Sequence, residues 1–315
     1  MKTAIAKAPN IKSEKKQDRK LLRREFRLNM DCYLYIAPWA VIFLVFTVAP
    51  VVMALGLGFT YFNMLELPRF IGLDNFKNLL ASDDLFIVAV KNTLSFAIII
   101  GPMGYLMSLM FAWFINELSP VTRAIMVTIM YAPSISGSGL MIWQMLFSGD
   151  QYGYLNGTML NLGIINQPIQ FVQTREYMFP IAIIVSLWMG MGVGFLSYVA
   201  GFKTVNKEQY EAAYVEGIRN RWQELWFITL PSIRPQMMFN AVLSVGGAFT
   251  VGGVMDQLFG FPSPGYATHT IMNHIQDFGV TRFDMGYACA IATLLFLTMI
   301  GTNELFQRIL QKVGQ

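Results

Sequence analysis

Long runs without a charged residue alternate with short charged segments along the whole chain. Eight runs of at least 19 residues contain no Asp, Glu, Lys or Arg. A helix needs about 20 mostly apolar residues to cross a bilayer, and a charge at mid-membrane costs at least about 2.5 kcal/mol. Two runs, 151–174 and 257–276, hold too many amides, prolines or histidines to lie in hydrocarbon. The other six predict spanning helices at about 33–59, 90–116, 124–147, 177–200, 236–257 and 285–306.

The positions of Lys and Arg predict the orientation of these spans. Eighteen lie in the two tails and the connections on the same side, and five lie in the opposite connections. Cytoplasmic segments carry the excess of Lys and Arg, so we expect both termini in the cytoplasm. The predicted organisation is a basic cytoplasmic tail (1–31), a transmembrane domain (32–310) with a cytoplasmic loop (201–235), and a short tail (311–315).

Composition narrows the class of protein further. Hydrophobic residues make up 55% of the chain and charged residues 13%, against about 25% charged in soluble domains. The 25 Phe, 21 Met and 6 Trp exclude a disordered or nucleic-acid-binding chain, which would be rich in charge. The sequence therefore predicts an all-α, multi-pass membrane protein that contacts lipid and no nucleic acid.

Three outer connections are long. In the first, Leu73, Phe76, Leu79 and Leu80 recur at helical spacing and predict a short amphipathic helix at the outer interface. The segments 148–176 and 259–284 are typical of outer caps or docking surfaces, but their composition identifies no ligand.

The cytoplasmic loop 201–235 predicts a helical hairpin. Asn206 can cap a first helix that stops at Gly217, and a second helix after Asn220 carries Trp222 and Trp226 within one turn. Two interpretations are open from these residues alone. The hairpin either rests on the lipid surface as an amphipathic element or presents a helix to the groove of a cytoplasmic partner.

One part of this loop resembles the EAA loop of the membrane-spanning subunits of bacterial ABC importers. The matching residues are Glu211, Ala212, Ala213, Glu216 and Gly217, followed by Ile228, Leu230 and Pro231. In that family the two small residues and the glycine let a short coupling helix fit a cleft on the ATPase subunit. The segments 70–76 and 152–156 resemble the MalF-like half of the carbohydrate type, a binding-protein-dependent transport system inner membrane component.

The loop departs from the family pattern at two places. Ten residues separate Gly217 from Ile228 where the common pattern has nine, and Val205-Asn206 replaces the usual proline-containing entry. The additional residue is expected to change the angle of the second helix, and with it the docking roles of Trp222 and Trp226.

The resemblance implies a function and a set of partners. The chain is expected to form half of the translocation pathway of an importer for a sugar or oligosaccharide in the bacterial inner membrane. Its expected partners are a second permease subunit in a heterodimer, two ATPase subunits, and an extracytoplasmic solute-binding protein. ATP and Mg are expected on the ATPase, and no cofactor on this chain.

The residues themselves indicate no catalytic chemistry. No phosphate-binding loop with its Gly-Lys pair follows a predicted strand, and no Ser-His-Asp set is assignable, so the chain is not expected to be an enzyme. His269 and His274 lie five apart near Asp277, but such side chains diverge on a helix and too few ligands converge for a metal site.

A pathway for a polar solute needs hydrogen-bonding groups inside the membrane. The fifth span supplies Asn240, Ser244 and Thr250, with two Gly-Gly pairs that would loosen the helix, and Asp256 at its outer end. Ser136 in the third span is a further candidate. For Asp256 the competing explanation is an interfacial residue in contact with water, and for the others it is packing between helices. Close helix packing is also the interpretation of Ser186, Gly190 and Gly194 in the fourth span.

Three other functions are considered. An importer for a non-carbohydrate solute would share all of these features. A secondary transporter or channel would need embedded charges or an internal repeat, and a membrane-bound enzyme would need a catalytic set, none of which is evident in the sequence.

Overall fold

The structure, a computed structural model, describes residues 29–136 and 139–311. It divides the chain into two compact units, Met1–Gly56 and Leu57–Gln315, which are described separately. The predicted tails, 1–31 and 311–315, lie almost entirely outside the described residues, so their boundaries stay predictions. The described chain is mostly helical, in agreement with the predicted fold class.

The described part of the first unit is one long apolar helix. It runs as α2 (Met30–Phe43), a π-helical turn η1 (Leu44–Val48) and α3 (Ala49–Leu57). The turn lies directly before Pro50, whose ring would clash with a carbonyl of the preceding α-helical turn. None of its residues is buried, and large side chains such as Trp39 and Phe46 are exposed on all sides. A helix that is apolar all round needs a hydrocarbon environment.

The second unit is a bundle of helices with one short two-stranded ladder in its described part. Its first elements are β1 (Thr60–Tyr61), β2 (Arg69–Phe70), α4 (Asp74–Ala81), α5 (Asp84–Asn116), α6 (Pro120–Ile135), α7 (Gly139–Leu146), α8 (Tyr154–Asn161), α9 (Arg175–Met189) and α10 (Val193–Thr204). Then follow α11 (Lys207–Val215), α12 (Arg221–Glu224), η2 (Leu225–Thr229), α13 (Leu230–Ser232), α14 (Arg234–Phe249), α15 (Gly252–Phe259), η3 (Pro264–Tyr266), α16 (Ile271–Gln276), η4 (Asp277–Thr281) and α17 (Met285–Gln311).

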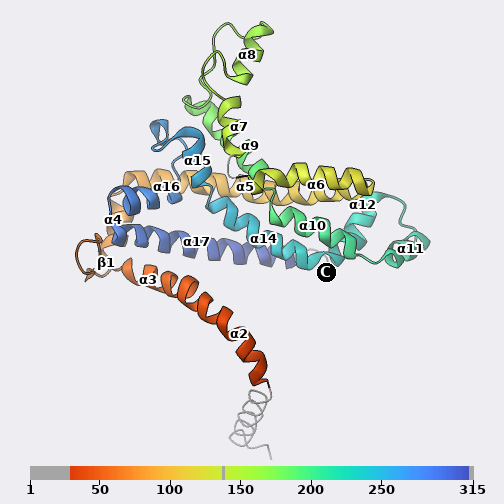
Figure 1. Ribbon diagram of the computed structural model, residues 1–315, viewed down its shortest axis with the longest axis horizontal. Coiled ribbons are helices and arrows are strands. Elements are labelled where there is room, and N and C mark those ends of the chain that lie inside the picture. Colours follow the sequence, from red (N-terminus) through yellow and green to blue (C-terminus); the bar gives the residue numbers. More distant parts are fainter. Residues whose placement is uncertain (1–28, 137–138, 312–315) are drawn as a thin grey trace, which may run out of the picture. The chain divides into compact units, whose positions relative to one another are not determined.

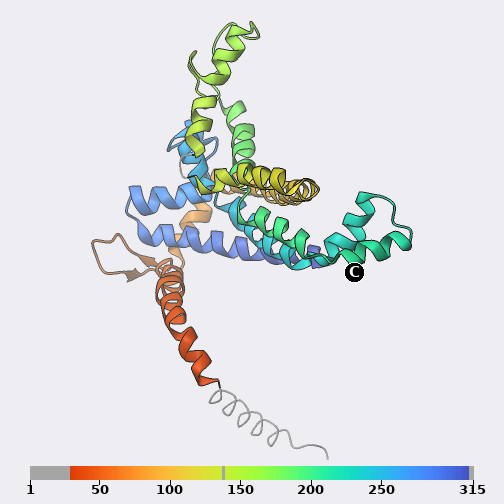
Figure 2. The ribbon, with the colours of Figure 1, turned by 45° about the vertical axis from the view of Figure 1, so that its right-hand side comes forward.

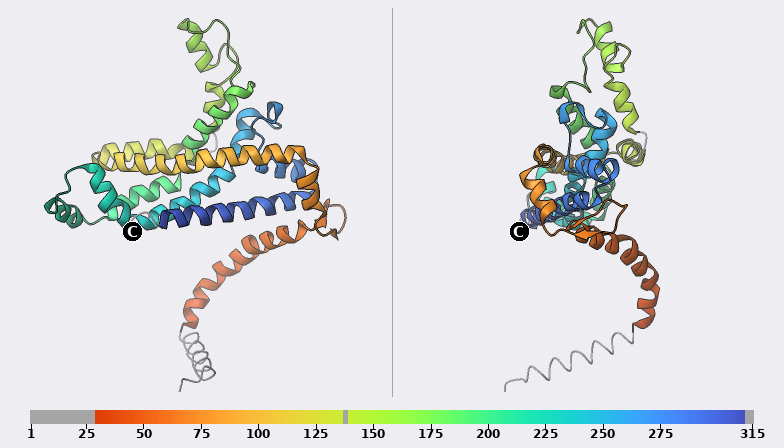
Figure 3. Two further views of the ribbon diagram at one scale, coloured as in Figure 1. Left: turned by 180° about the vertical axis from the view of Figure 1, so that it is seen from behind. Right: turned by 90° about the vertical axis from the view of Figure 1, so that its left-hand side faces the viewer.

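The long helices of this unit run side by side. Helix α5 packs against α10 and α14, and α14 also packs against α17 (Figures 1 and 3). The hairpin of α11 and α12 lies at one end of the bundle, beside the last turns of α17, and α4 and α16 lie at the other end (Figures 1 and 2). The ladder pairs Thr60 with Phe70 in antiparallel register. The all-α prediction missed it because a two-residue strand carries no detectable period.

Only part of the predicted span pattern is continuous helix. Three helices, Met30–Leu57, α5 and α17, are long and apolar enough to cross a membrane, and up to six crossings result if each bent pair counts as one. Helices α9 and α10 meet at 46°, and α14 and α15 at 44°. The predicted span 124–147 corresponds to α6 and α7, which flank residues 137–138 outside the described part.

Helix α5 begins six residues before its predicted start. Asp83 caps it by accepting a hydrogen bond from the backbone N–H of Phe86 at 3.0 Å. A helix need not end where the hydrocarbon ends, so charge-free runs underestimate its length. Helix α4 forms where the amphipathic pattern predicts it, and Leu79 is fully buried, but Leu73 and Leu80 are exposed.

The segment 259–284, which the sequence predicts to lie outside the membrane, contains two histidines that are almost completely buried. His269 and His274 are 3% and 1% exposed. His274 Nε2 lies 2.9 Å from Asp83 Oδ2, and His274 Nδ1 lies 3.1 Å from His269 Nε2. Tyr287 of α17 donates its hydroxyl to the same Asp83 oxygen at 3.0 Å. The two histidines and Asp83 therefore join the first turn of α5 to α16 and the start of α17, and no metal cluster occurs among the described residues.

The hydrogen bonds among Asp83, His274 and His269 determine which ring nitrogens donate and which accept. Burial opposes ionisation of Asp83, but the hydrogen bond from His274 and that from the backbone of Phe86 hold its pKa below the ordinary value. A carboxylate only accepts, so His274 donates from Nε2, and when both rings are neutral it accepts at Nδ1 from His269. This leaves His269 Nδ1 as a buried acceptor without a partner in the described chain. Burial, together with the nearby His274, lowers the pKa of His269 to about 4.

Acidification should destabilise the protein through His269. Folded His269 stays neutral down to about pH 4, whereas the unfolded chain takes up this proton below about pH 6.5. Stability is therefore complete above pH 6.5 and falls as the pH drops toward 4, by about 2 kcal/mol at pH 5. We expect the unfolding temperature of the wild type in detergent to fall more between pH 7.5 and 5 than that of His269→Gln. Parallel decreases in the two proteins would contradict this assignment.

Candidate functional site: a polar cavity and a helical hairpin

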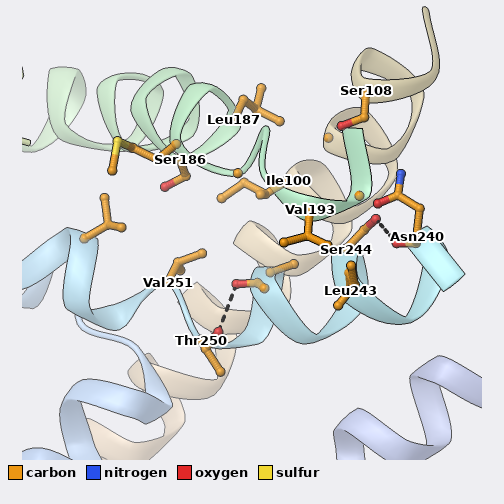
Figure 4. Close-up of a pocket in the computed structure, with 17 residues that line it drawn as sticks. Ile100, Ser108, Ser186, Leu187, Val193, Asn240, Leu243, Ser244, Thr250 and Val251 are labelled. Carbon is orange, nitrogen blue, oxygen red and sulfur yellow. Dashed lines mark hydrogen bonds between the residues drawn. The ribbon is translucent and has the colours of Figure 1, made fainter. Parts of the chain in front are cut away.

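A cavity of about 410 Å³ lies among α5, α9, α10, α14 and the start of α15 (Figure 4). Its volume is within the range of small-molecule sites. The polar side chains in its wall come from three helices: Ser108 of α5, Ser186 of α9, and Asn240, Ser244 and Thr250 of α14. The three residues predicted from the fifth span therefore line one space.

Two polar atoms in this wall, Ser186 Oγ and Asn240 Nδ2, are covered and make no hydrogen bond of ordinary geometry within the described chain. Both side chains are at most 5% exposed, and that of Asn240 lies near the Tyr198 hydroxyl. An unsatisfied buried polar group costs about 1–3 kcal/mol. In contrast, the hydroxyl of Ser244 donates to the backbone carbonyl of Asn240 at 2.6 Å. The wall therefore combines hydroxyl groups whose hydrogen bonds are made within the protein with two covered polar atoms whose hydrogen-bonding capacity is unused.

Two of the three bent helix pairs, α9 with α10 and α14 with α15, break at the cavity. Gly190 lies at the end of α9, and Val193 and Gly194 at the start of α10, and all three line the wall. The amide N–H groups of the first turn of a helix have no intrahelical acceptor, so α10 offers backbone donors here. The other break, at Thr250 and Val251, also lines the cavity. It lies between the two Gly-Gly pairs, as the sequence predicts.

Gly194 leaves room for the side chain of Asn240. A Cβ at Gly194 would collide with the Asn240 amide oxygen. The small residues of the fourth span, Ser186, Gly190 and Gly194, therefore have two roles. Gly194 allows α14 to pack closely, and Ser186 and Gly190 form part of the cavity wall.

The structure does not bring every predicted pathway residue to the cavity. Asp256 of α15 accepts a hydrogen bond from Asn273 of α16 and is only half-buried, and Ser136 is exposed at the end of α6. Sequence reasoning missed Ser108, which is 4% exposed. Its spacing of four from Gly104, which also lines the cavity, was the available signal.

The predicted hairpin is present, and Gly217 ends its first helix. The N–H of Ile218 donates to the Ala213 carbonyl at 3.0 Å, and the N–H of Gly217 to the Tyr214 carbonyl at 3.3 Å. This pair of bonds defines the Schellman motif, in which the residue after the helix takes a positive φ. Gly217 has φ +101°. Asn206 caps α11 and Asn220 caps α12 through their side-chain oxygens.

A groove of about 440 Å³ runs along the hairpin. It is lined by Ala212, Ala213, Glu216, Ile228 and Pro231 of the predicted coupling set, together with Gln209, Ile218, Phe227 and Ser232. The other three predicted residues do not line it: Glu211 and Gly217 are exposed, and Leu230 is buried in the core. In the described chain Glu211 and Glu216 have no ion-pair partner.

Hydrogen bonds tie the two arms of the hairpin together. Glu224, which is 5% exposed, accepts from the Tyr214 hydroxyl at 2.5 Å and from Arg221 at 2.8 Å. The bond to Glu224 raises the pKa of Tyr214. The hydroxyl groups of Tyr210 and Thr229 lie 2.8 Å apart. A buried carboxylate needs such partners, so the angle between the arms is fixed.

The hairpin is also joined to the end of α5. Arg221 forms a second ion pair with Glu117 at 3.1 Å, and the rings of Trp222 and Trp113 lie 4.9 Å apart. Because Trp222 packs on α5, its contact with the bundle is established, although its ring remains 61% exposed.

The additional residue of the loop coincides with a π-helical turn. The second arm is α-helical in α12, π-helical in η2 (Leu225–Thr229) and α-helical again in α13. A π turn holds one residue more than an α turn, so η2 takes up the extra residue between Gly217 and Ile228 within the helix.

Comparison with known proteins identifies the family. The family described as "Binding-protein-dependent transport system inner membrane component" matches residues 85–312. The chain belongs to this family. It is 32% identical over 279 residues to a probable ABC transporter permease protein, YesP, of Bacillus subtilis, with 87% of each chain covered. It is thus a multi-pass permease subunit of a transport system that depends on a binding protein.

Two further similarities agree with this assignment. The arabinooligosaccharides transport system permease protein AraP of Bacillus subtilis is 26% identical, over 85% of this chain and 84% of that protein. The fold matches a chain in the crystal structure of a bacterial ABC transporter involved in the import of the acidic polysaccharide alginate. That match has a TM-score of 0.75 at 24% identity and covers 93% of this chain and 99% of the other.

Packing at the cavity can be tested with two glycines from its wall. We expect Gly194→Ala to lower the unfolding temperature in detergent, because the new Cβ meets the Asn240 amide and overpacking costs about 1–3 kcal/mol. Gly247→Ala is the matched control, since it lines the same cavity with nothing within 4 Å of an added Cβ. Alanine is a better helix former there, so no loss is expected. Equal unfolding temperatures for the two variants would contradict the contact between Gly194 and Asn240.

Proposed function

We propose that this permease forms half of the pathway by which an ABC importer carries a sugar or oligosaccharide across the membrane. The observation that carries the proposal is the cavity, whose wall contains polar side chains from separate helices, Ser108, Ser186, Asn240, Ser244 and Thr250. A polyhydroxylated solute offers both donors and acceptors to such groups. The name of the arabinooligosaccharide relative supports a carbohydrate.

The proposed topology has six crossings with both termini in the cytoplasm. Each bent pair then forms one crossing. The Lys and Arg bias supports this orientation. The position of the hairpin beside the last turns of α17, at the end of the bundle opposite α4 and α16, agrees with it (Figures 1 and 2). In this topology two crossings lie between the hairpin and the C-terminus, so the hairpin and the C-terminus must lie on the same side of the membrane.

The proposed assembly contains several chains. A second permease subunit closes the cavity from its other side in a heterodimer. Two ATPase subunits bind ATP and Mg, and one of them receives the groove and the residues of the coupling set, Glu211 to Gly217 with Ile228, Leu230 and Pro231. A solute-binding protein delivers the sugar from outside. Because the hairpin is bonded to α5, movement of the ATPase reaches the cavity through that helix.

Uptake by the complete transporter tests the role of the cavity. We expect Asn240→Leu to reduce uptake of labelled arabino-oligosaccharides about tenfold, since the variant keeps the volume but loses a hydrogen bond worth about 1–3 kcal/mol. Asn161→Leu, at an exposed position of α8, should leave uptake unchanged. Unchanged uptake in Asn240→Leu would contradict the pathway. Uptake of labelled oligopeptides instead of sugars would favour the non-carbohydrate importer.

Coupling through the hairpin is tested at Gly217. We expect Gly217→Asp to keep membrane insertion but to weaken co-purification of the ATPase and abolish uptake, because a side chain at φ +101° costs about 1–2 kcal/mol and distorts the turn. Gly163→Asp is the control: its φ is +69°, it also follows a helix, and it lies outside the hairpin. If Gly217→Asp retained normal ATPase attachment and uptake, the hairpin would be a lipid-resting element instead.

A further inference from the structure

A second cavity lies between the hairpin and the bundle. It has a volume of about 390 Å³ and forms where the end of α5 meets α6, α10, α11 and α12. Its floor contains the buried rings of Trp113 and Phe202, which are 9% and 5% exposed. Neither the solute cavity nor the coupling groove includes any of its twelve lining residues.

Four basic and two acidic side chains line this second cavity. Arg221 is neutralised by its ion pairs with Glu117 and Glu224. The guanidinium of Arg123 donates to the backbone carbonyls of Asn116 and Leu118, at the C-terminal end of α5, at 2.6 and 2.9 Å. Both arginines are therefore occupied by the protein itself.

Two lysines remain without a partner. In the described chain, Lys203 at the last turn of α10 and Lys207 at the first turn of α11 form no ion pair or hydrogen bond. Both line the cavity, so its net charge is two positive units. Both side chains are exposed to solvent, so an anion with several acceptor oxygens would replace water at these two ammonium groups.

The neighbouring surface is typical of the lipid headgroup layer. Trp222 contacts the floor at Trp113, and Trp222 and Trp226 are each 61% exposed. Exposed tryptophans gather at the boundary of the bilayer, and basic pockets between membrane helices bind anionic headgroups. Phe114 and Val121, at the adjoining ends of α5 and α6, are 53% and 71% exposed and give acyl chains an apolar surface.

We propose that this cavity binds the phosphate group of an anionic phospholipid through Lys203 and Lys207. The bound lipid would lie between the hairpin and the end of α5, where it would join the coupling element to the bilayer. The inference does not depend on which solute the transporter carries.

Lipid retention by the full-length chain tests the proposal. Native mass spectrometry in detergent would follow binding of phosphatidylglycerol and phosphatidylcholine with the same acyl chains. The variant is Lys203→Gln/Lys207→Gln. The control, Lys77→Gln/Lys91→Gln, removes the same charge from α4 and the opposite half of α5 and leaves the basic N-terminal tail unchanged.

We expect the Lys203→Gln/Lys207→Gln variant to bind phosphatidylglycerol about 30-fold more weakly, since each lysine near an anionic surface contributes about 1 kcal/mol. Phosphatidylcholine binding and the control variant should match the wild type. Lys203→Arg/Lys207→Arg should retain binding and would show that loss in the first variant is not misfolding.

Three outcomes would overturn the proposal. The first is unchanged phosphatidylglycerol binding in the Lys203→Gln/Lys207→Gln variant, and the second is an equal loss of binding in both glutamine variants. The third is loss of ATPase attachment in the Lys203→Gln/Lys207→Gln variant while lipid binding is intact, which would assign the cavity to the ATPase interface. Competition by millimolar inorganic phosphate identifies the source of the anion. If phosphate displaces phosphatidylglycerol only from proteins that retain both lysines, binding of the lipid phosphate group at Lys203 and Lys207 is supported. A free phosphate anion would then be an alternative occupant of the same cavity.

Discussion

Backbone hydrogen bonding in hydrocarbon is the constraint on which this structure depends. Every amide and carbonyl at membrane depth must have a partner, so a helix can break only where the freed groups face protein or a water-filled space. The two described breaks, after Met189 and at Thr250, both border the solute cavity. At the second break the Thr250 hydroxyl donates to the freed carbonyl of Gly246 at 3.0 Å. The site and the irregular backbone therefore occur together for one physical reason.

Helix α5 links the parts of the second unit that carry polar chemistry. It has 33 residues without a break, which corresponds to about 50 Å. Asp83 anchors the histidines at its first turn, Ser108 lines the cavity, and Trp113 and Glu117 hold the hairpin. Pro102 removes one backbone hydrogen bond within α5, but Ser108 and the hairpin contacts all follow it in the same helical stretch. The contacts at the hairpin and at the cavity are thus mechanically connected through one element.

Buried charge fixes the geometry at both ends of α5. At the hairpin, Glu224 needs Tyr214 and Arg221, and the bond from Tyr214 joins the two arms, as does the contact between the Tyr210 and Thr229 hydroxyls. At the other end, Asp83 needs His274 and Tyr287. A carboxylate away from water is tolerated only with such partners, so each cluster allows one arrangement of the helices around it.

Local rules of the chain were readable from the sequence alone. Charge-free runs located the apolar helices, because a charge in hydrocarbon is costly, and Asn206, Asn220 and Gly217 marked the ends of the hairpin helices, because caps act within one turn. The motif around Glu211–Gly217 indicated the family. Asn240, Ser244 and Thr250 were found because polar residues in an apolar span are conspicuous. What the sequence could not show depends on residues distant in the chain. Burial of His269 and His274 requires Asp83, nearly 200 positions away, and Ser108 becomes part of a site only when α5 packs beside α14. Hydropathy describes each segment by its own composition, whereas a cavity or a buried hydrogen-bond chain exists only between segments, and therefore only the tertiary structure decides it.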